Sequence, residues 1–123
     1  MSNSEQMDFE ISFYENIVKE KPDHIDALVA LGDAYTKIGR YKEGLAVDLK
    51  LSKLKPDDPV VRYNLACSYS RLKTADLCLK SLKKAIKLGY RDFSFMRDDP
   101  DLEFIRKDPE YKDLLSKYLK ETG

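Results

Sequence analysis

Few residues in this chain have a type and a position that could support catalysis. His24 is the single histidine among the 123 residues, and it lies in a turn beside Asp23, close to Asp26. General acid–base chemistry needs a titratable group within reach of an activated one. Turns that begin with Pro22 and Asp23 ordinarily break helices, so we expect His24 to have either a structural role or no role. The five glycines are scattered and form no phosphate-binding loop, and we expect no enzymatic activity.

Two cysteines could offer thiol or metal chemistry. Cys67 and Cys78 are eleven residues apart, which is not the spacing of a Cys-x-x-Cys pair, and no histidine lies near either of them. Zinc sites and redox disulfides are recognised by such close pairs. We therefore expect reduced, buried thiols, with no bound metal and no cofactor.

Charge is balanced overall but segregated along the chain. Lys plus Arg and Asp plus Glu each total 22, so global charge gives no attraction to nucleic acid or membranes. One segment carries lysines at helical spacing, and an acidic stretch follows it: Lys80, Lys83, Lys84 and Lys87, then Asp98, Asp99, Asp101 and Glu103. A lysine stripe is usually a solvated face, and the acidic stretch lacks the glycine and alternating ligands of a calcium loop. The stripe leaves one alternative open, which is salt-sensitive binding of RNA or another anionic partner.

The elements that position these residues are predicted to be helices. Apolar residues recur at helical spacing over about 5–20, 25–38, 41–54, 59–72 and 75–88. Pro22, Gly39, Pro56 and Gly89 lie at the ends of these segments, where they interrupt or close a helix. Because the connections are short, consecutive helices should pack as antiparallel neighbours.

Residue types recur with a fixed period of thirty-four residues. The run Leu31-Gly32-x-x-Tyr35 returns as Leu65-Ala66-x-x-Tyr69, and further pairs keep the same step: Leu45 and Leu79, Leu54 and Leu88, Pro22 and Pro56. A period of this length predicts stacked helical units rather than one closed core. Small residues occupy matching places in the two copies, Gly32 and Gly44 in the first, Ala66 and Cys78 in the second. We expect them where two helices cross closely.

At these residues the chain resembles a tetratricopeptide repeat protein. The resemblance implies an all-α solenoid of antiparallel helix pairs, wound as a right-handed superhelix, in a single domain over 1–123. It divides the chain into a lone N-terminal helix at 5–24, repeats at 25–58 and 59–92, and a C-terminal cap at 93–123. The cap is similar to an ending seen on small, mainly bacterial repeat proteins, carried here by Asp99-Pro100-Asp101-Leu102, Asp108-Pro109 and Leu114-Leu115. We expect two short helical turns at about 92–96 and 100–107, then a final helix from 109 to about 121.

The family's first helices line a concave groove that binds extended or helical peptides. The resemblance places two sets of side chains on this wall: Asp26, Val29, Ala30, Asp33 and Lys37, then Tyr63, Asn64, Cys67, Ser70 and Arg71. The core periodicity leaves these positions free, and the alternative is that they are only a solvated face. Val29 and Asp33 stand where the family's carboxylate clamp has lysine and asparagine, and only Asn64 matches that clamp. We therefore expect no binding of acidic chaperone tails.

The N-terminal helix carries a second candidate surface. It resembles the second helix of a repeat whose first helix is missing, and Phe9 and Phe13 lie on a face beyond its core positions. Exposed aromatic residues on a terminal helix mark interfaces, so these two could support self-association, including a homodimer, or docking to a partner helix. The alternative is that the N-terminal segment folds back over them.

Together these features predict an adaptor, scaffold or assembly factor that binds a protein partner through the groove or the N-terminal helix. No apolar run reaches the ~20 residues of a membrane-spanning helix. The first residues have neither the basic nor the apolar part of a secretory signal. We expect a cytoplasmic protein.

Overall fold

The computed structural model describes residues 3–122, and side chains up to residue 119. Over this range every regular element is helical, which confirms the predicted all-α class. Two compact units divide at Pro56, near the predicted junction between the repeats. The elements in order are α1 (Asn3–Glu20), α2 (Ile25–Lys37), α3 (Tyr41–Leu54), α4 (Pro59–Arg71), α5 (Ala75–Lys87), α6 (Phe93–Asp98), η1 (Pro100–Leu102), η2 (Ile105–Lys107) and α7 (Pro109–Thr122).

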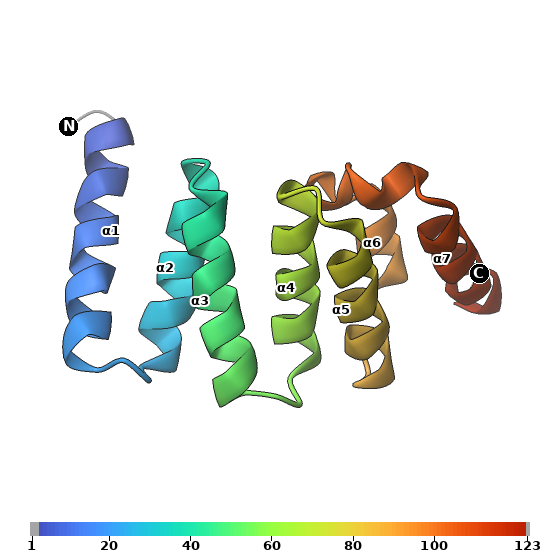
Figure 1. Ribbon diagram of the computed structural model, residues 1–123, viewed down its shortest axis with the longest axis horizontal. Helices are drawn as coiled ribbons and strands as arrows, with labels where there is room; N and C mark the ends of the chain where they lie inside the picture. The colour runs from blue at the N-terminus through green and yellow to red at the C-terminus, as the bar shows by residue number, and fades with distance from the viewer. Residues whose placement is uncertain (1–2, 123) are drawn as a thin grey trace. The chain divides into compact units, whose positions relative to one another are not determined.

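The first unit consists of α1, α2 and α3, which lie side by side as antiparallel neighbours (Figure 1). Its core is made by apolar residues at helical spacing: Ile11, Ala27, Leu28, Leu31, Ala34, Tyr35, Val47 and Leu51. The glycines predicted at the crossing do lie between α2 and α3. A Cβ atom built on Gly32 would stand 3.3 Å from Cγ1 of Val47, and one built on Gly44 would stand 3.3 Å from Oγ1 of Thr36. The two helices therefore approach more closely than larger residues would permit.

The short connections are built by residues that cap helices or reverse the chain. His24 is the N-cap of α2, where its Nδ1 accepts a hydrogen bond from the Ala27 N–H at 3.1 Å. Asp58 caps α4 in the same way, through the N–H groups of Val60 and Val61. Gly39 follows α2 with a φ of 81°, a backbone conformation that costs glycine no steric energy. The histidine is thus engaged as a helix cap.

Replacing Gly44 with leucine is expected to lower the free energy of unfolding by about 2 kcal/mol, because the crossing has no room for a larger side chain. Urea denaturation followed by circular dichroism would measure the loss. The matched control is Ala46→Leu, which adds the same side chain at an exposed position of the same helix. Equal stability of the two variants would show that the close approach of α2 and α3 is not what selects glycine.

The second unit packs α4 against α5 and closes with the C-terminal segment. Here the thirty-four-residue period ends, and α6, η1 and η2 replace the first helix of a third copy. Their side chains join one apolar cluster with the second repeat: Cys78, Leu82, Ala85, Phe93, Met96, Leu102, Ile105 and Tyr111 are all 2% exposed or less. The two short turns and the final helix lie close to the predicted ranges. Among the described residues, no helix is long and apolar enough to span a membrane.

Candidate functional site

The α2 positions expected to face a partner are open to solvent in the first unit. Asp26, Asp33 and Lys37 are exposed, Val29 is 43% exposed, and Ala30 is half-buried. Residues three or four apart share one face of a helix, so these side chains form a continuous surface of three charged residues and two apolar ones, Val29 and Ala30. This surface is accessible to solvent.

The equivalent positions on α4 differ, and the expectation of an open wall does not hold there. Tyr63 and Cys67 are 4% exposed, and Ser70 is completely buried. Arg71 is largely covered, with 15% of its side chain accessible. Only Asn64 is exposed among the five expected residues. The physical reason is that η1, in the C-terminal segment, packs against α4.

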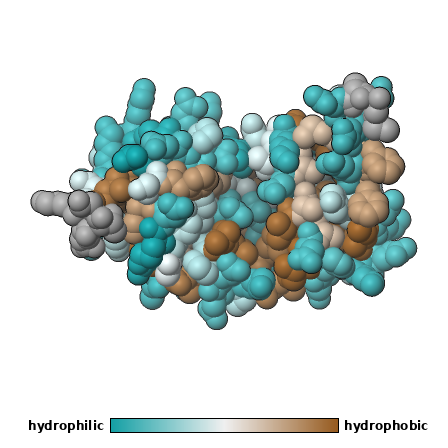
Figure 2. Space-filling view, turned by 180° about the vertical axis from the view of Figure 1, so that it is seen from behind, coloured by the Kyte–Doolittle hydropathy of each residue, from teal (hydrophilic) through white to brown (hydrophobic). Residues whose placement is uncertain are grey.

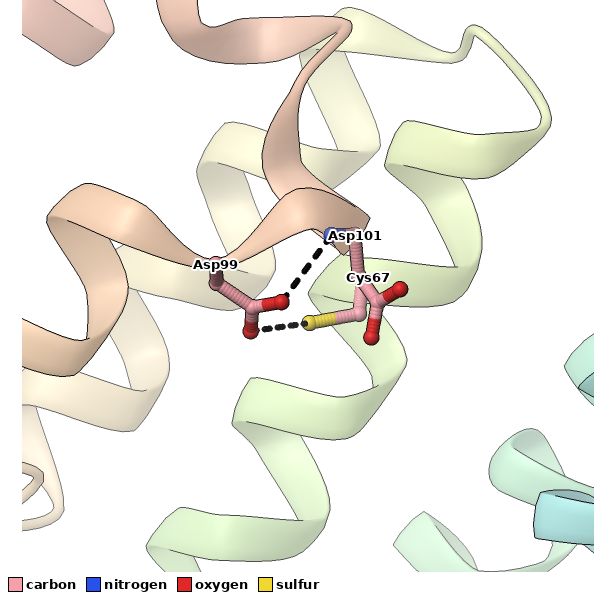
Figure 3. A group of neighbouring side chains, drawn as sticks. All are labelled: Cys67, Asp99 and Asp101. Carbon is pink, nitrogen blue, oxygen red and sulfur yellow. Dashed lines mark hydrogen bonds between the residues drawn. The ribbon is translucent and has the colours of Figure 1, made fainter.

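Asp99 is the residue that closes this face of α4, and the residue is 4% exposed. The Tyr63 hydroxyl donates to Oδ2 of Asp99 at 2.5 Å, and the Cys67 thiol approaches the same oxygen at 3.8 Å. The other oxygen, Oδ1, accepts the backbone N–H of Asp101 at 2.9 Å and so caps η1. Figure 3 shows the carboxylate between the Cys67 thiol and the Asp101 N–H. The side chain of Asp101 in turn forms an ion pair with Arg71.

Burial keeps the donors of this network protonated. Burial first, then the charges of Asp99 and Asp101, raises the pKa of the Cys67 thiol well above its ordinary value. Burial is also the largest cause that raises the pKa of Tyr63, and the hydrogen bond to Asp99 adds to it. A thiol with a raised pKa is a poor nucleophile. Cys67 therefore serves as a packed donor to Asp99 and is not an activated catalytic group.

Cys67, Asp99 and Asp101 also stand close enough together to be considered as metal ligands. Their ligand atoms lie within 4.8 Å of one another. A metal would need the thiolate form of Cys67, which burial opposes, and it would have to displace Arg71 from Asp101. Both oxygens of Asp99 already accept hydrogen bonds. The donor set fits a hydrogen-bonded contact between α4 and η1 better than it fits a metal.

An aromatic group extends from this contact to the surface. The ring of Tyr63 stacks on Tyr90 with centroids 4.4 Å apart, and Phe95 of α6 lies 6.2 Å away at a tilt of 56°. Phe95 is 54% exposed, so the group ends in an accessible aromatic side chain. Sequence reasoning missed Asp99 and Phe95 as neighbours of α4. The available signal is the Asp99-Pro100-Asp101-Leu102 motif, whose residue types by themselves predict a cap and not a contact with α4.

Phe9 and Phe13 are accessible on α1, at 65% and 53% exposure. The ring of Phe13 meets that of Tyr14 edge-on, with centroids 5.2 Å apart, and about half of Phe13 stays accessible. Residues from Asn3 onward continue α1 as helix, so the described N-terminal residues do not fold back over the two rings. Hydrophobic surface is visible on the α1 side of the molecule, among hydrophilic residues, in Figure 2.

The opposite face of α1 is fixed against α2. Ile11 is buried, and the Tyr35 hydroxyl of α2 donates to Oε2 of Glu15 at 2.5 Å. Burial, with the Glu15 hydrogen bond as the second cause, raises the pKa of Tyr35 to about 12. This anchoring orients the Phe9 and Phe13 face away from α2.

The lysine stripe on α5 is partly neutralised by the final helix. Lys80, Lys83 and Lys87 are exposed and Lys84 is half-buried. Nζ of Lys83 lies 3.1 Å from Oε2 of Glu110 in α7. An exposed pair of this kind adds little stability, but it lowers the positive potential that a phosphate backbone would meet.

Two comparisons with known proteins bear on the whole arrangement. The model of the tetratricopeptide repeat family matches residues 25–58 and 60–88. The chain is also 39% identical, over 90 residues, to a protein of Arabidopsis thaliana whose name describes it as chloroplastic. That match covers 71% of this chain and 27% of the relative, so the chain spans about a quarter of that protein's length.

The family match covers more than half of the chain, and the helix pairs α2–α3 and α4–α5 coincide with the matched residues. The chain therefore belongs to the tetratricopeptide repeat family, as its sequence indicates. The family match also confirms the predicted all-α solenoid class. The similarity of the C-terminal segment to the ending of small bacterial repeat proteins stays a prediction.

Proposed function

We propose that this chain is a non-catalytic protein-interaction module, an adaptor, scaffold or assembly factor that binds a peptide or a helix of a partner protein. Tetratricopeptide repeats generally mediate contacts between proteins. The observation that carries the proposal is the accessible aromatic face of α1, where Phe9 and Phe13 are more than half exposed. Large apolar side chains grouped in this way are typical of interaction sites. A partner helix, or a second copy of the chain, would remove them from water.

The exposed face of α2 supports a second contact for the same kind of partner. Val29 offers apolar area, and Asp26, Asp33 and Lys37 around it offer both signs of charge. Of the five residues expected on α4, only Asn64 is exposed, since Tyr63, Cys67 and Ser70 are buried where η1 packs against the helix. Asp33 would repel a terminal carboxylate. For this reason we continue to predict that this chain does not bind acidic chaperone tails.

The alternative of electrostatic binding to nucleic acid gains no support from the described residues. Lys83, at the middle of the stripe, already pairs with Glu110. The cytoplasmic location also stays a prediction, and the word "chloroplastic" belongs to the name of the Arabidopsis relative.

Site-specific photo-crosslinking would test the proposed surfaces. A photoreactive phenylalanine analogue is placed singly at Phe9, at Val29 and, as the matched control, at Leu77, which is 42% exposed on α5. In extract of the native cells, we expect protein crosslinks from position 9 or 29 that survive nuclease and physiological salt. Crosslinks from position 77 alone, or products lost on nuclease treatment, would contradict the proposal.

A further inference from the structure

A pocket of about 620 Å³ lies on the C-terminal unit, between α7 and the segment that contains α6 and η2. One long side of the pocket is a stripe of α7 side chains three or four residues apart. The opposite side is formed by Arg97 of α6 and Arg106 of η2. The lining residues are Arg97, Arg106, Tyr111, Lys112, Leu115, Ser116 and Leu119. The stripe extends over two helical turns, so the pocket can receive side chains from successive turns of another helix.

The lining of this pocket is cationic over an apolar base. Three of its seven residues, Arg97, Arg106 and Lys112, are basic, and none is acidic. Arg97 also pairs with the exposed Asp98, the next residue in the chain. The guanidinium of Arg106 is held in place, because it donates to the carbonyl oxygens of Arg97 and Asp99 at 3.1 and 2.6 Å. Lys112 is exposed and forms no ion pair within the described part of the chain. An occupant should therefore combine apolar side chains with negative charge.

The chain itself contains a helix with these properties. Phe9 and Phe13 protrude from α1 one turn apart, and Asp8 and Glu10 are exposed beside Phe9. Over its whole length α1 has five acidic residues, Glu5, Asp8, Glu10, Glu15 and Glu20, against the single basic residue Lys19. Its accessible face is aromatic and its charge is opposite to that of the pocket.

We propose that the pocket on α7 binds α1 of a second copy of this chain, with Phe9 and Phe13 on its apolar base and acidic residues of α1 against Arg97, Arg106 and Lys112. This inference relies on one part of the proposed function, which is that the α1 face acts as an interface. Two different patches meet at each contact between α1 and the pocket. Two such contacts exchanged reciprocally would close an isologous dimer, whereas one contact between neighbouring copies would be heterologous and would extend a chain of copies.

Direct pairing of two α1 helices is the less favourable alternative. Each α1 has an excess of four acidic residues, from five acidic and one basic. Like charges brought together at an interface disfavour association. Contact between α1 and the pocket removes the same two aromatic rings from water and replaces the repulsion with attraction. Added salt should weaken it, because screening acts on such exposed charges.

Charge reversal in sedimentation equilibrium tests the pairing. We expect the unmodified chain to associate as its concentration rises. Arg97→Glu with Lys112→Glu should weaken association by about tenfold or more, and Asp8→Lys with Glu10→Lys should do the same. All four changes in one chain should restore it. The matched control is Lys80→Glu with Lys87→Glu, which makes the same charge change on α5 and should leave association unaltered.

Disulfide trapping identifies the surfaces that meet. One chain carries Ser12→Cys on α1 and another carries Ser116→Cys in the pocket, both at exposed positions, whereas the native Cys67 and Cys78 are buried. Mixing them under oxidising conditions should give the mixed disulfide in preference to either symmetric one. Excess of the symmetric Ser12→Cys product would overturn the proposal while leaving α1 as an interface.

The remaining outcomes separate this inference from the general function. A chain that stays monomeric at millimolar concentration would overturn the pocket proposal. Photo-crosslinks from position 9 to another protein would still support the interaction module in that case. The pocket proposal would also be overturned if Arg97→Glu with Lys112→Glu left the association constant unaltered.

Discussion

Replacing Asp99 with alanine is expected to lower the free energy of unfolding by about 3 kcal/mol. The change leaves the Tyr63 hydroxyl and the Cys67 thiol buried without their acceptor, and it removes the cap of η1. A buried donor that loses its partner keeps the full cost of its removal from water. Urea denaturation of the intact chain would measure the loss, and hydrogen exchange of the α4 amides would locate it in the second unit.

The neighbouring acid provides the control for this change. Asp98 is exposed and forms an ion pair with the adjacent Arg97, so Asp98→Ala should leave the denaturation midpoint nearly unaltered. Tyr63→Phe should have an effect between the two, since it removes one donor and leaves Asp99 with its other contacts. If Asp99→Ala and Asp98→Ala unfold at the same urea concentration, the contact between α4 and η1 does not stabilise the unit.

Replacing Tyr111 with alanine is expected to lower the free energy of unfolding by about 4 kcal/mol. Tyr111 is 1% exposed, belongs to the apolar cluster of the second unit, and donates its hydroxyl to the Met96 carbonyl at 3.2 Å. Truncation leaves a cavity where α7 joins α6, and the surrounding helices can close it only in part. Thermal and urea denaturation of the full chain would measure this effect.

Two variants divide the effect of Tyr111 into its parts. Tyr111→Phe keeps the ring and removes one hydrogen bond, so it should cost about 1 kcal/mol. Phe104→Ala removes an aromatic ring that is 44% exposed in the same segment, and should cost much less than Tyr111→Ala. Similar losses for Tyr111→Ala and Phe104→Ala would mean that α7 is not held by the buried ring.

The helices and their ends follow from the sequence because their signals are local. The observed α2, Ile25–Lys37, begins at the residue expected after Pro22 and Asp23 and ends beside Gly39. Capping, proline geometry and the positive φ of glycine act within a few residues of each boundary. The position of Gly32 and Gly44 at a helix crossing was predictable for the same reason, since short connections leave α2 and α3 few ways to pack.

The accessible face of the second repeat could not be predicted in this way. Val29 and Tyr63 occupy the same place in the two copies, thirty-four residues apart, yet one is 43% exposed and the other 4%. Asp33 and Cys67 are a second such pair, one exposed and one buried. Periodicity treats each pair as equivalent, because it contains no information about which later segment packs over them.

By itself the sequence determined the all-α class, the family, and the position of the helices and of the aromatic pair on α1. Each of these depends on residue types within one or two helices. Only the tertiary structure decided that the inner side of α4 is closed by Asp99, and that α7 forms a basic pocket with α6 and η2. These contacts join residues as far apart as Tyr63 and Asp99, thirty-six positions along the chain. A segment's own pattern does not specify such distant partners, since they are selected by the packing of the whole unit.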